Sequence, residues 1–272
     1  MPQPHPLGLP TFWEVRAPAA WACIDFISDL HLAEDTPRTF EAWAEHLLST
    51  PADAVFILGD LFEVWVGDDA RHAGFEARCA EVLAEAAATR SVAFMAGNRD
   101  FLVGGDMLKA CGVMALPDPT VLIAFGERLM LSHGDALCVD DVEYQAFRRQ
   151  VRSDEWQAAF LARPLADRRE TARQIRAQSE LRKTQQAGMP WYDVDSGSAV
   201  RWMHEAGTPT LVHGHTHRPG SEPMAPGFIR HVLSDWDLDH GDHAGRAEVL
   251  RWRRSGLTRV APSRRDAGIT GR

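Results

Sequence analysis

Residues 22–32 read ACIDFISDLHL and residues 54–60 read AVFILGD, and these two stretches decide the fold class. Each is an apolar run of strand length that ends in an aspartate, which is typical of a buried strand whose last residues enter a loop. A third run, SVAFMA (91–96), ends at Gly97-Asn98 in the same way. Helical patterns separate the runs, and this alternation predicts an α/β fold.

Two helices and several further strands are predicted from the spacing of apolar residues. Thr36-Pro37 marks a helix start, because proline is favoured in the first turn. The expected core face of this helix is Phe40, Trp43, Ala44 and Leu47, and that of the next helix is Phe75, Cys79, Val82, Leu83 and Ala86. The strands expected in the second half are TVLIAF (120–125), RLMLS (128–132), TLV (210–212), FIRHVL (228–233) and AEVLRW (247–252). Gly126-Glu127 predicts a hairpin between the first two of these.

The composition limits the class of protein. With 45% apolar and 25% charged residues, the 272-residue chain can bury a sizeable core. A formal charge of −9 argues against a nucleic-acid binder, which needs a basic face. The four widely spaced cysteines suit reduced thiols of a cytosolic protein, and no apolar run approaches the roughly 20 residues of a membrane span. We expect a main domain over residues 21–260, between a loose N-terminal extension (1–20) and a polar tail (261–272).

Residues 144–186 differ from the rest of the chain, since they carry no strand signal and read as consecutive helices broken near Pro164. They contain ten basic against five acidic side chains, a local charge of +5 in a chain of −9. We interpret this segment as a helical cap, inserted over residues 141–190. Its apolar side chains, Trp156 and Phe160 among them, are expected to form an apolar slot or only to pack the cap onto the main domain.

Polar side chains of the kind that bind divalent metals follow the predicted strands. They are Asp29, His31, Asp60, Asn98, His133, His215 and His217. Carboxylate, imidazole and amide groups suit borderline-hard divalent cations, and the loops beyond strand ends are where an open α/β sheet presents its ligand site. Glycines beside Asp60, Asn98 and His215 permit sharp turns and a close approach of the backbone. A carboxylate that bridges two metals about 4 Å apart would let them share one hydroxide.

Each of these motifs alone has an ordinary explanation. An Asp-x-His after a strand is usually a turn aspartate with a surface histidine, Gly-Asp is commonly a turn, and Gly-His-Thr-His can be a pair of solvated histidines. The five motifs D-x-H, GD, GN, HGD and GHxH, however, each follow a separate apolar run. Their joint occurrence by chance is remote, and it predicts a two-metal site.

The blocks around these motifs resemble a known family. They are FISDLHL (26–32), FILGDLFEVWVGDD (56–69), GNRDFLVG (97–104), SHGDALCVDD (132–141) and VHGHTHRP (212–219). They resemble the calcineurin-like metallophosphoesterases and, in detail, the UDP-2,3-diacylglucosamine pyrophosphohydrolases. The resemblance covers about residues 22–252 and implies the calcineurin-like fold, a two-sheet β-sandwich flanked by helices, with an inserted helical cap.

The resemblance also implies two metal ions, typically manganese in this family. Asp29, His31, Asp60 and His217 would hold one ion, and Asp60, Asn98, His133 and His215 the other, with Asp60 as the bridge. Asp60, Asn98, Arg99 and His215 would form the catalytic group. The substrate-binding group would be Asn98, Arg99, Asp141, Ser179, Lys183, Gln186 and His215. Better-studied members carry Asn and Lys where this chain has Lys183 and Gln186.

The reaction and its location follow from the same resemblance. A metal-activated hydroxide would attack the α-phosphorus of UDP-2,3-diacylglucosamine and release UMP and 2,3-diacylglucosamine 1-phosphate, a step of lipid A biosynthesis in Gram-negative bacteria. The enzyme is expected in the cytoplasm, peripherally associated with the cytoplasmic leaflet of the inner membrane. There, cap arginines such as Arg168, Arg169 and Arg173 would meet anionic headgroups.

Arg99 stands where many members of the superfamily place a histidine that can protonate an alkoxide leaving group. An arginine stays charged and is a poor proton donor, but it binds phosphate oxygens bidentately. A phosphate monoester, whose second pKa is about 6, can leave without that acid. Arg99 therefore favours cleavage of a P–O–P bond, unless it only forms a salt bridge with Asp100 or Asp135.

The sequence also suggests roles for three further residues and two alternative functions. Asp68 and Asp69 are expected to support the Asp60 loop through backbone hydrogen bonds, and His213 to be buried beside the site. The enzyme alternative is a phosphoesterase for a soluble nucleotide pyrophosphate or diester, against which the cap and Arg99 count. The non-enzyme alternative is a scaffold of this fold that only binds partners, against which the complete set of metal-binding residues counts.

Overall fold

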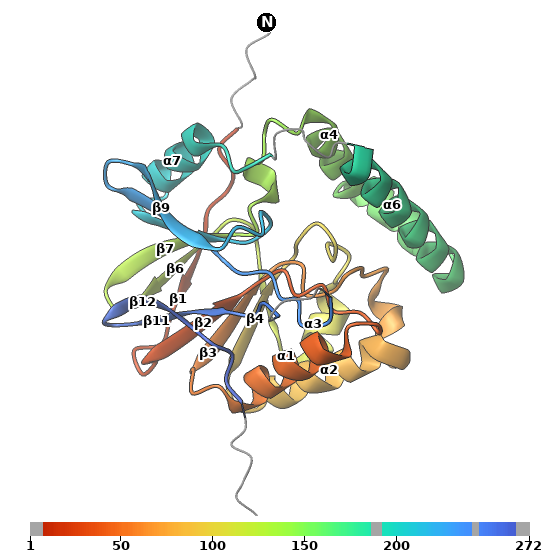
Figure 1. Ribbon diagram of the computed structural model, residues 1–272, viewed down its shortest axis with the longest axis horizontal. Coiled ribbons are helices and arrows are strands. Elements are labelled where there is room, and N and C mark those ends of the chain that lie inside the picture. The colour runs from red at the N-terminus through yellow and green to blue at the C-terminus, as the bar shows by residue number, and fades with distance from the viewer. Residues whose placement is uncertain (1–7, 186–191, 241–244, 265–272) are drawn as a thin grey trace, which may run out of the picture.

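Two six-stranded sheets pack face to face, and helices cover the outer face of each (Figure 1). The computed structural model describes residues 8–185, 192–240 and 245–264, with only the backbone described for 178–185. Both sheets mix parallel and antiparallel pairs. The layered α/β fold that the sequence predicted is confirmed.

The strands of each sheet come from distant parts of the chain. In one sheet the order is β1 (Trp13–Arg16), β6 (Thr120–Ala124), β7 (Glu127–Ser132), β8 (Thr210–His213), β10 (Phe228–Val232) and β9 (Gly220–Ala225). In the other sheet the order is β12 (Gly256–Val260), β11 (Val249–Arg253), β2 (Cys23–Ile27), β3 (Ala54–Leu58), β4 (Ser91–Met95) and β5 (Met114–Leu116). Strands β2, β3 and β4 run parallel, so their carboxyl ends meet at one edge.

The side chains of each central strand alternate between two cores. Ile24 and Phe26 point into the core between the sheets, while Ile27 and Ile57 belong to the core under the helices. Because both faces are covered, β2 and β3 are buried throughout, and this is why they read as continuous apolar runs.

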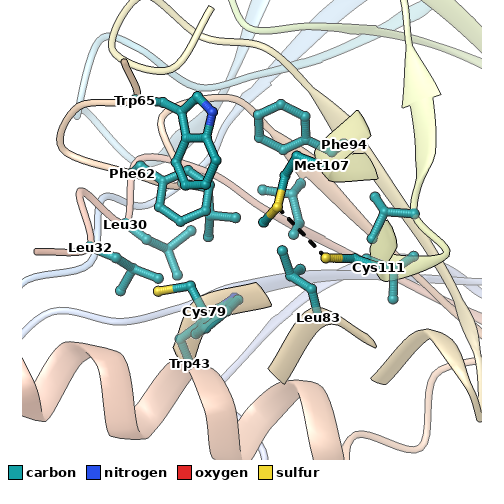
Figure 2. Packing of buried hydrophobic residues seen from close by; sticks show 14 of the residues in the cluster. Leu30, Leu32, Trp43, Phe62, Trp65, Cys79, Leu83, Phe94, Met107 and Cys111 are labelled. Carbon is teal, nitrogen blue, oxygen red and sulfur yellow. Dashed lines mark hydrogen bonds between the residues drawn. The ribbon is translucent and has the colours of Figure 1, made fainter. Parts of the chain in front are cut away.

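Four helices form the outer layers. They are α1 (Pro37–Ser49), α2 (Gly74–Ala87) and α3 (Gly105–Cys111) on one sheet, and α7 (Ser196–Glu205) on the other. Figure 2 shows the core under the first three, where Trp43 and Cys79 pack with Leu30 and Leu32 from the loop after β2. Trp43 and Trp202 are core residues, as predicted, and all four cysteines are buried and unpaired.

Several short strands are absent from the sequence-based prediction. Trp13–Arg16 pairs in parallel with β6, so four residues of the expected loose extension (1–20) belong to a sheet. The edge strands β5, β9 and β12 were also missed, because β5 has only three residues and polar residues interrupt the apolar pattern of β9 and β12. The predicted hairpin of β6 and β7 is confirmed.

Three consecutive helices lie to one side of the sandwich, beyond the strand ends (Figure 1). They are α4 (Val142–Val151), α5 (Asp154–Leu161) and α6 (Leu165–Gln185). The break at Pro164 directly precedes α6, as the sequence predicted. Within the described residues, no helix combines the length and apolar character needed to cross a bilayer.

Candidate metal centre

The loops that follow five strands bring the predicted metal-binding side chains together. Asp29 and His31 follow β2, and Asp60 follows β3. Asn98 follows β4, His133 follows β7, and the pair His215 and His217 follows β8. The cluster therefore draws side chains from both sheets, at the end of the sandwich where β2, β3, β4, β7 and β8 terminate.

One group of side chains surrounds the first candidate position. Nε2 of His31 lies 3.3 Å from Nε2 of His217, which in turn lies 3.4 Å from Oδ1 of Asp29. Oδ2 of Asp60 lies 4.0 Å from Nε2 of His31. Metal–ligand bonds of about 2.1 Å place neighbouring ligands roughly 3 Å apart, so these atoms have the spacing of ligands around one ion.

A second group lies on the other side of Asp60. Its Oδ1 is 3.7 Å from Nε2 of His133. Oδ1 of Asn98 is 3.0 Å from that same nitrogen and 2.8 Å from Nδ1 of His215. Since the two oxygens of Asp60 face different groups, this carboxylate has the geometry of a bridging ligand. Oxygen and nitrogen donors without a thiolate fit two borderline divalent transition-metal cations, without selecting one.

The backbone at these side chains adopts an uncommon conformation. Asp29, His31, Asp60, His215 and His217 have φ angles of 55°, 49°, 52°, 67° and 51°. Residues other than glycine enter this left-handed region at a cost of about 1–3 kcal/mol, and such residues concentrate at functional sites. The neighbouring Gly97 is required for space, since a Cβ there would overlap the Asp60 carboxylate.

Buried hydrogen bonds hold the loops in register. The Asp29 carboxylate accepts bonds of 3.0 Å from the backbone N–H of His215, which ties β2 to β8 across the two sheets. The Asp100 carboxylate accepts 2.8 Å bonds from the N–H groups of Leu61 and Gly97. Burial and the nearby Asp60 raise the pKa of Asp100 to about 7. The sequence carried no signal for this role of Asp100.

Three of the histidine rings have a polar partner at Nδ1, the nitrogen on the opposite side of the ring from Nε2. Nδ1 of His133 lies 2.9 Å from the carbonyl oxygen of Leu58, which leaves its Nε2 facing the cluster. Nδ1 of His31 lies 3.3 Å from Glu63, and Nδ1 of His217 lies 3.8 Å from Asp235. Such partners fix ring orientation and raise ligand basicity.

The two histidines beside Asn98 have pKa values that are shifted in opposite directions. Burial opposes protonation of His133, but Asp60, Asp135 and Asp29 outweigh it and raise its pKa to about 9. Burial and the charge of His133 lower the pKa of His215 to about 4. Because a metal binds the neutral imidazole, metal affinity at His133 is expected to depend on pH. His213 is fully buried beside the site, as expected, and burial lowers its pKa to about 4.

Arg99 borders the cluster, and its partner differs from the two that the sequence suggested. Its backbone N–H donates to Oδ1 of Asp60 at 2.8 Å, and its guanidinium lies 3.3 Å from Glu63. Asp100 is occupied by backbone N–H groups, and Asp135 pairs with Arg148 at 2.7 Å. The predicted alternative of a salt bridge to Asp100 or Asp135 is therefore wrong.

The acidic pair after Trp65 also has a different role from the predicted one. Asp68 accepts bonds from the N–H groups of Gly104 and Met107, so it supports the start of α3 rather than the Asp60 loop. Asp69 binds the guanidinium of Arg168 in the cap.

The cap contacts the site through α4. Asp141 caps α4 by accepting a 3.0 Å bond from the N–H of Tyr144. The Tyr144 hydroxyl donates to Asp135 at 2.5 Å, and its ring stacks on that of His215 with centroids 6.0 Å apart. The side chains of Ser179 and Lys183, and all of Gln186, lie outside the described residues.

The structure places four cap side chains that the sequence singled out. Phe160 is buried in the core under the helices, and Trp156 stacks on it with centroids 4.8 Å apart, so both pack α5 onto the main domain. Arg168 is buried by its pair with Asp69, and Arg169 pairs with Glu76 at 2.9 Å. These two ion pairs tie α6 to the main domain, with Arg168 buried and Arg169 partly exposed.

Known proteins resemble this chain over most of its length. A family profile described as calcineurin-like phosphoesterase matches residues 24–219. The UDP-2,3-diacylglucosamine hydrolase of Chromobacterium violaceum is 46% identical over 230 residues, which cover 82% of this chain and 92% of that protein. The UDP-2,3-diacylglucosamine hydrolase of Aromatoleum aromaticum is 44% identical over 234 residues, covering 84% and 91%.

Among solved structures, a single mutant of Vps29 from Entamoeba histolytica aligns over 87% of this chain and 89% of its own, with 13% identity and a TM-score of 0.45. That degree of likeness carries no argument about activity. The family assignment follows from the profile and from the near full-length relatives. This chain belongs to the calcineurin-like phosphoesterases and, among them, to the family of the UDP-2,3-diacylglucosamine hydrolases.

Proposed function

We propose that this protein hydrolyses the pyrophosphate bond of UDP-2,3-diacylglucosamine to UMP and 2,3-diacylglucosamine 1-phosphate, in lipid A biosynthesis. The observation that carries the proposal is the position of Asp60, whose two oxygens face two separate groups of ligand atoms. The names and the high coverage of its relatives supply the substrate.

The proposed mechanism assigns a role to each side chain of the cluster. Asp29, His31, Asp60 and His217 would hold one divalent ion, and Asp60, Asn98, His133 and His215 a second, with Mn²⁺ as our candidate. Two such ions provide hydroxide at neutral pH and polarise phosphoryl oxygens. The left-handed loops and the backbone bonds to Asp29 and Asp100 hold these donors in place before substrate arrives.

Arg99 and the cap would bind the rest of the substrate. The backbone N–H of Arg99 donates to Asp60, and its guanidinium would hold the oxygens of the reacting phosphate, with Asn98 and His215 beside it. Asp141, Ser179, Lys183 and Gln186 are our candidates for the glucosamine phosphate. The helices over 141–190 would form the cap that encloses the substrate.

The acyl chains require apolar surface, and the cap exposes some. Phe147, one helical turn after Tyr144, is 37% exposed. Ile175, directly before Arg176, is 38% exposed. We propose these two side chains as acyl contacts in place of Trp156 and Phe160. Peripheral docking to the cytoplasmic leaflet would use exposed arginines of the cap such as Arg173.

Product analysis with the lipid substrate tests the proposed function. Purified protein with Mn²⁺ is expected to convert UDP-2,3-diacylglucosamine to UMP and the lipid phosphate, and a chelator should stop the reaction until Mn²⁺ is restored. A soluble nucleotide pyrophosphate serves as the comparison. Faster cleavage of the soluble compound would favour the alternative of a soluble substrate, and no cleavage of either would favour a binding scaffold.

The acyl contacts give a separate prediction. Phe147→Glu and Ile175→Glu are expected to raise KM for the diacylated substrate about tenfold or more, because each removes roughly 1.5–3 kcal/mol of apolar burial. Hydrolysis of a short, soluble phosphodiester should change little. Leu9→Glu is the control, since Leu9 is 53% exposed and lies outside the cap. An equal loss with both substrates would mean that these positions only support the fold.

A further inference from the structure

The Glu63 carboxylate meets basic groups from three separate parts of the chain. Its oxygens lie 3.3 Å from Nδ1 of His31 and 3.3 Å from the guanidinium of Arg99. It also forms a close ion pair with Arg176 of α6. The Glu63 side chain is only 12% exposed, so these contacts are largely shielded from water.

The contact with His31 acts on the first group of candidate ligands. Nε2 of His31 faces His217 and Asp60, so the ring presents its opposite nitrogen to Glu63. A carboxylate behind a metal-binding imidazole fixes its tautomer and its orientation, and loss of such a partner typically weakens metal binding 10- to 100-fold.

The Glu63 carboxylate also holds the guanidinium of Arg99, which is not a candidate metal ligand. The backbone of Arg99 is fixed by its bond to Asp60, while the end of its long side chain is held by Glu63. Glu63 follows Asp60 by three residues in the loop after β3. One short loop therefore carries both the bridging carboxylate and the group that orients the neighbouring ligand and the arginine.

The contact with Arg176 extends this arrangement to the cap. Arg168, Ala172 and Arg176 recur every four residues on α6, and all three contact the main domain. The Arg169–Glu76 pair at 2.9 Å also ties α6 to the main domain, but its contacts do not include a residue of the metal-binding cluster. Glu76 thus offers a natural control for Glu63.

We propose that Glu63 is a positioning residue that orients His31 and Arg99 relative to each other and holds α6 of the cap against this pair. The part that concerns Arg99 rests on the proposed function, whereas the parts that concern His31 and α6 do not. Glu63 would act through these three side chains and would not itself contact the reacting atoms.

Metal binding to the isolated protein tests the contact with His31. Free Mn²⁺ is measured by electron paramagnetic resonance as Mn²⁺ alone is titrated into wild-type protein, Glu63→Gln and Glu76→Gln. Glu63→Gln is expected to weaken one of two Mn²⁺ sites at least tenfold, and Glu76→Gln to leave both sites unchanged. Wild-type affinity in Glu63→Gln, or an equal loss in Glu76→Gln, would overturn the proposal. Because no phosphoester is present, the result is independent of the substrate.

Hydrogen exchange of the α6 backbone tests the contact with the cap. Glu63→Gln and Arg176→Gln are each expected to increase exchange in α6, and the double variant should exchange no faster than either single variant, since both remove one shared contact. Arg169→Gln should add to the effect of Glu63→Gln. Additive effects of Glu63→Gln and Arg176→Gln would contradict the shared contact.

A second substitution covers the case in which Glu63→Gln does not fold, as judged by circular dichroism. Glu63→Asp keeps the charge but withdraws the carboxylate by one methylene. It is expected to retain the fold and still to weaken one Mn²⁺ site severalfold. Wild-type Mn²⁺ affinity in a folded Glu63→Asp would show that the position of this carboxylate does not matter, and would equally overturn the proposal.

Discussion

Replacing Asp60 by asparagine is expected to abolish turnover, with a loss in kcat of more than about 100-fold. The two oxygens of Asp60 face different groups of ligand atoms, so the substitution removes the shared negative charge and replaces one oxygen by an amide –NH2 group, which cannot bind a cation. Steady-state assays at saturating Mn²⁺ measure the effect.

The fold should survive this change, because asparagine has the same shape and the backbone N–H groups of the loop keep their bonds to Asp100. Asp53→Asn is a matched control, since Asp53 accepts backbone bonds from Ala22 and Cys23 at the opposite end of β3. That variant should retain nearly full activity. An Asp60→Asn enzyme that keeps more than a tenth of the wild-type rate would rule out the bridging role.

Replacing Arg99 by alanine is expected to lower kcat/KM about 100- to 1,000-fold, the usual effect of removing one charge-assisted contact from a transition state. The fold should be unaffected, because Glu63 keeps its contacts with His31 and Arg176. Arg99→Lys is expected to recover only part of the loss, since an ammonium group cannot bind phosphate bidentately.

Arg99→His provides a further comparison. It introduces a side chain that can donate a proton, but it should not create a good phosphomonoesterase without other changes. Unaltered kinetics in Arg99→Ala would leave Arg99 with only its ion pair to Glu63.

The central strands of the fold were predicted well, because strands that are buried on both faces have continuous apolar sequences. Strands β2 and β3 are buried on both faces, and the candidate ligands Asp29 and Asp60 lie where these apolar runs end. The edge strands were missed for the opposite reason. In β9, for example, most residues are at least partly exposed, and Pro223 interrupts the pattern.

Tertiary contacts between distant polar residues were beyond the reach of the sequence. His31 and Arg176 are far from Glu63 in the sequence, and no periodic pattern relates the three positions. Nothing in the sequence therefore indicated that Glu63 contacts both, although it lies within the block at 56–69. Asp235, behind His217, belongs to no motif at all. In the cap, helical spacing could not distinguish buried Phe160 from exposed Phe147, because both lie on amphipathic helices.

The origin of the cluster in two sheets has a consequence for folding kinetics. Asp29, His31, Asp60 and Asn98 follow strands of one sheet, whereas His133, His215 and His217 follow strands of the other. Neither sheet offers a complete coordination sphere, so the sites can form only after the chain has closed loops of more than a hundred residues. Cations that bind the native state but not the unfolded chain would then slow unfolding. They would lower the rate at which the two sheets separate more than the rate at which any single element frays. Metal binding at the catalytic centre would thus also stabilise the packing of the two sheets against each other.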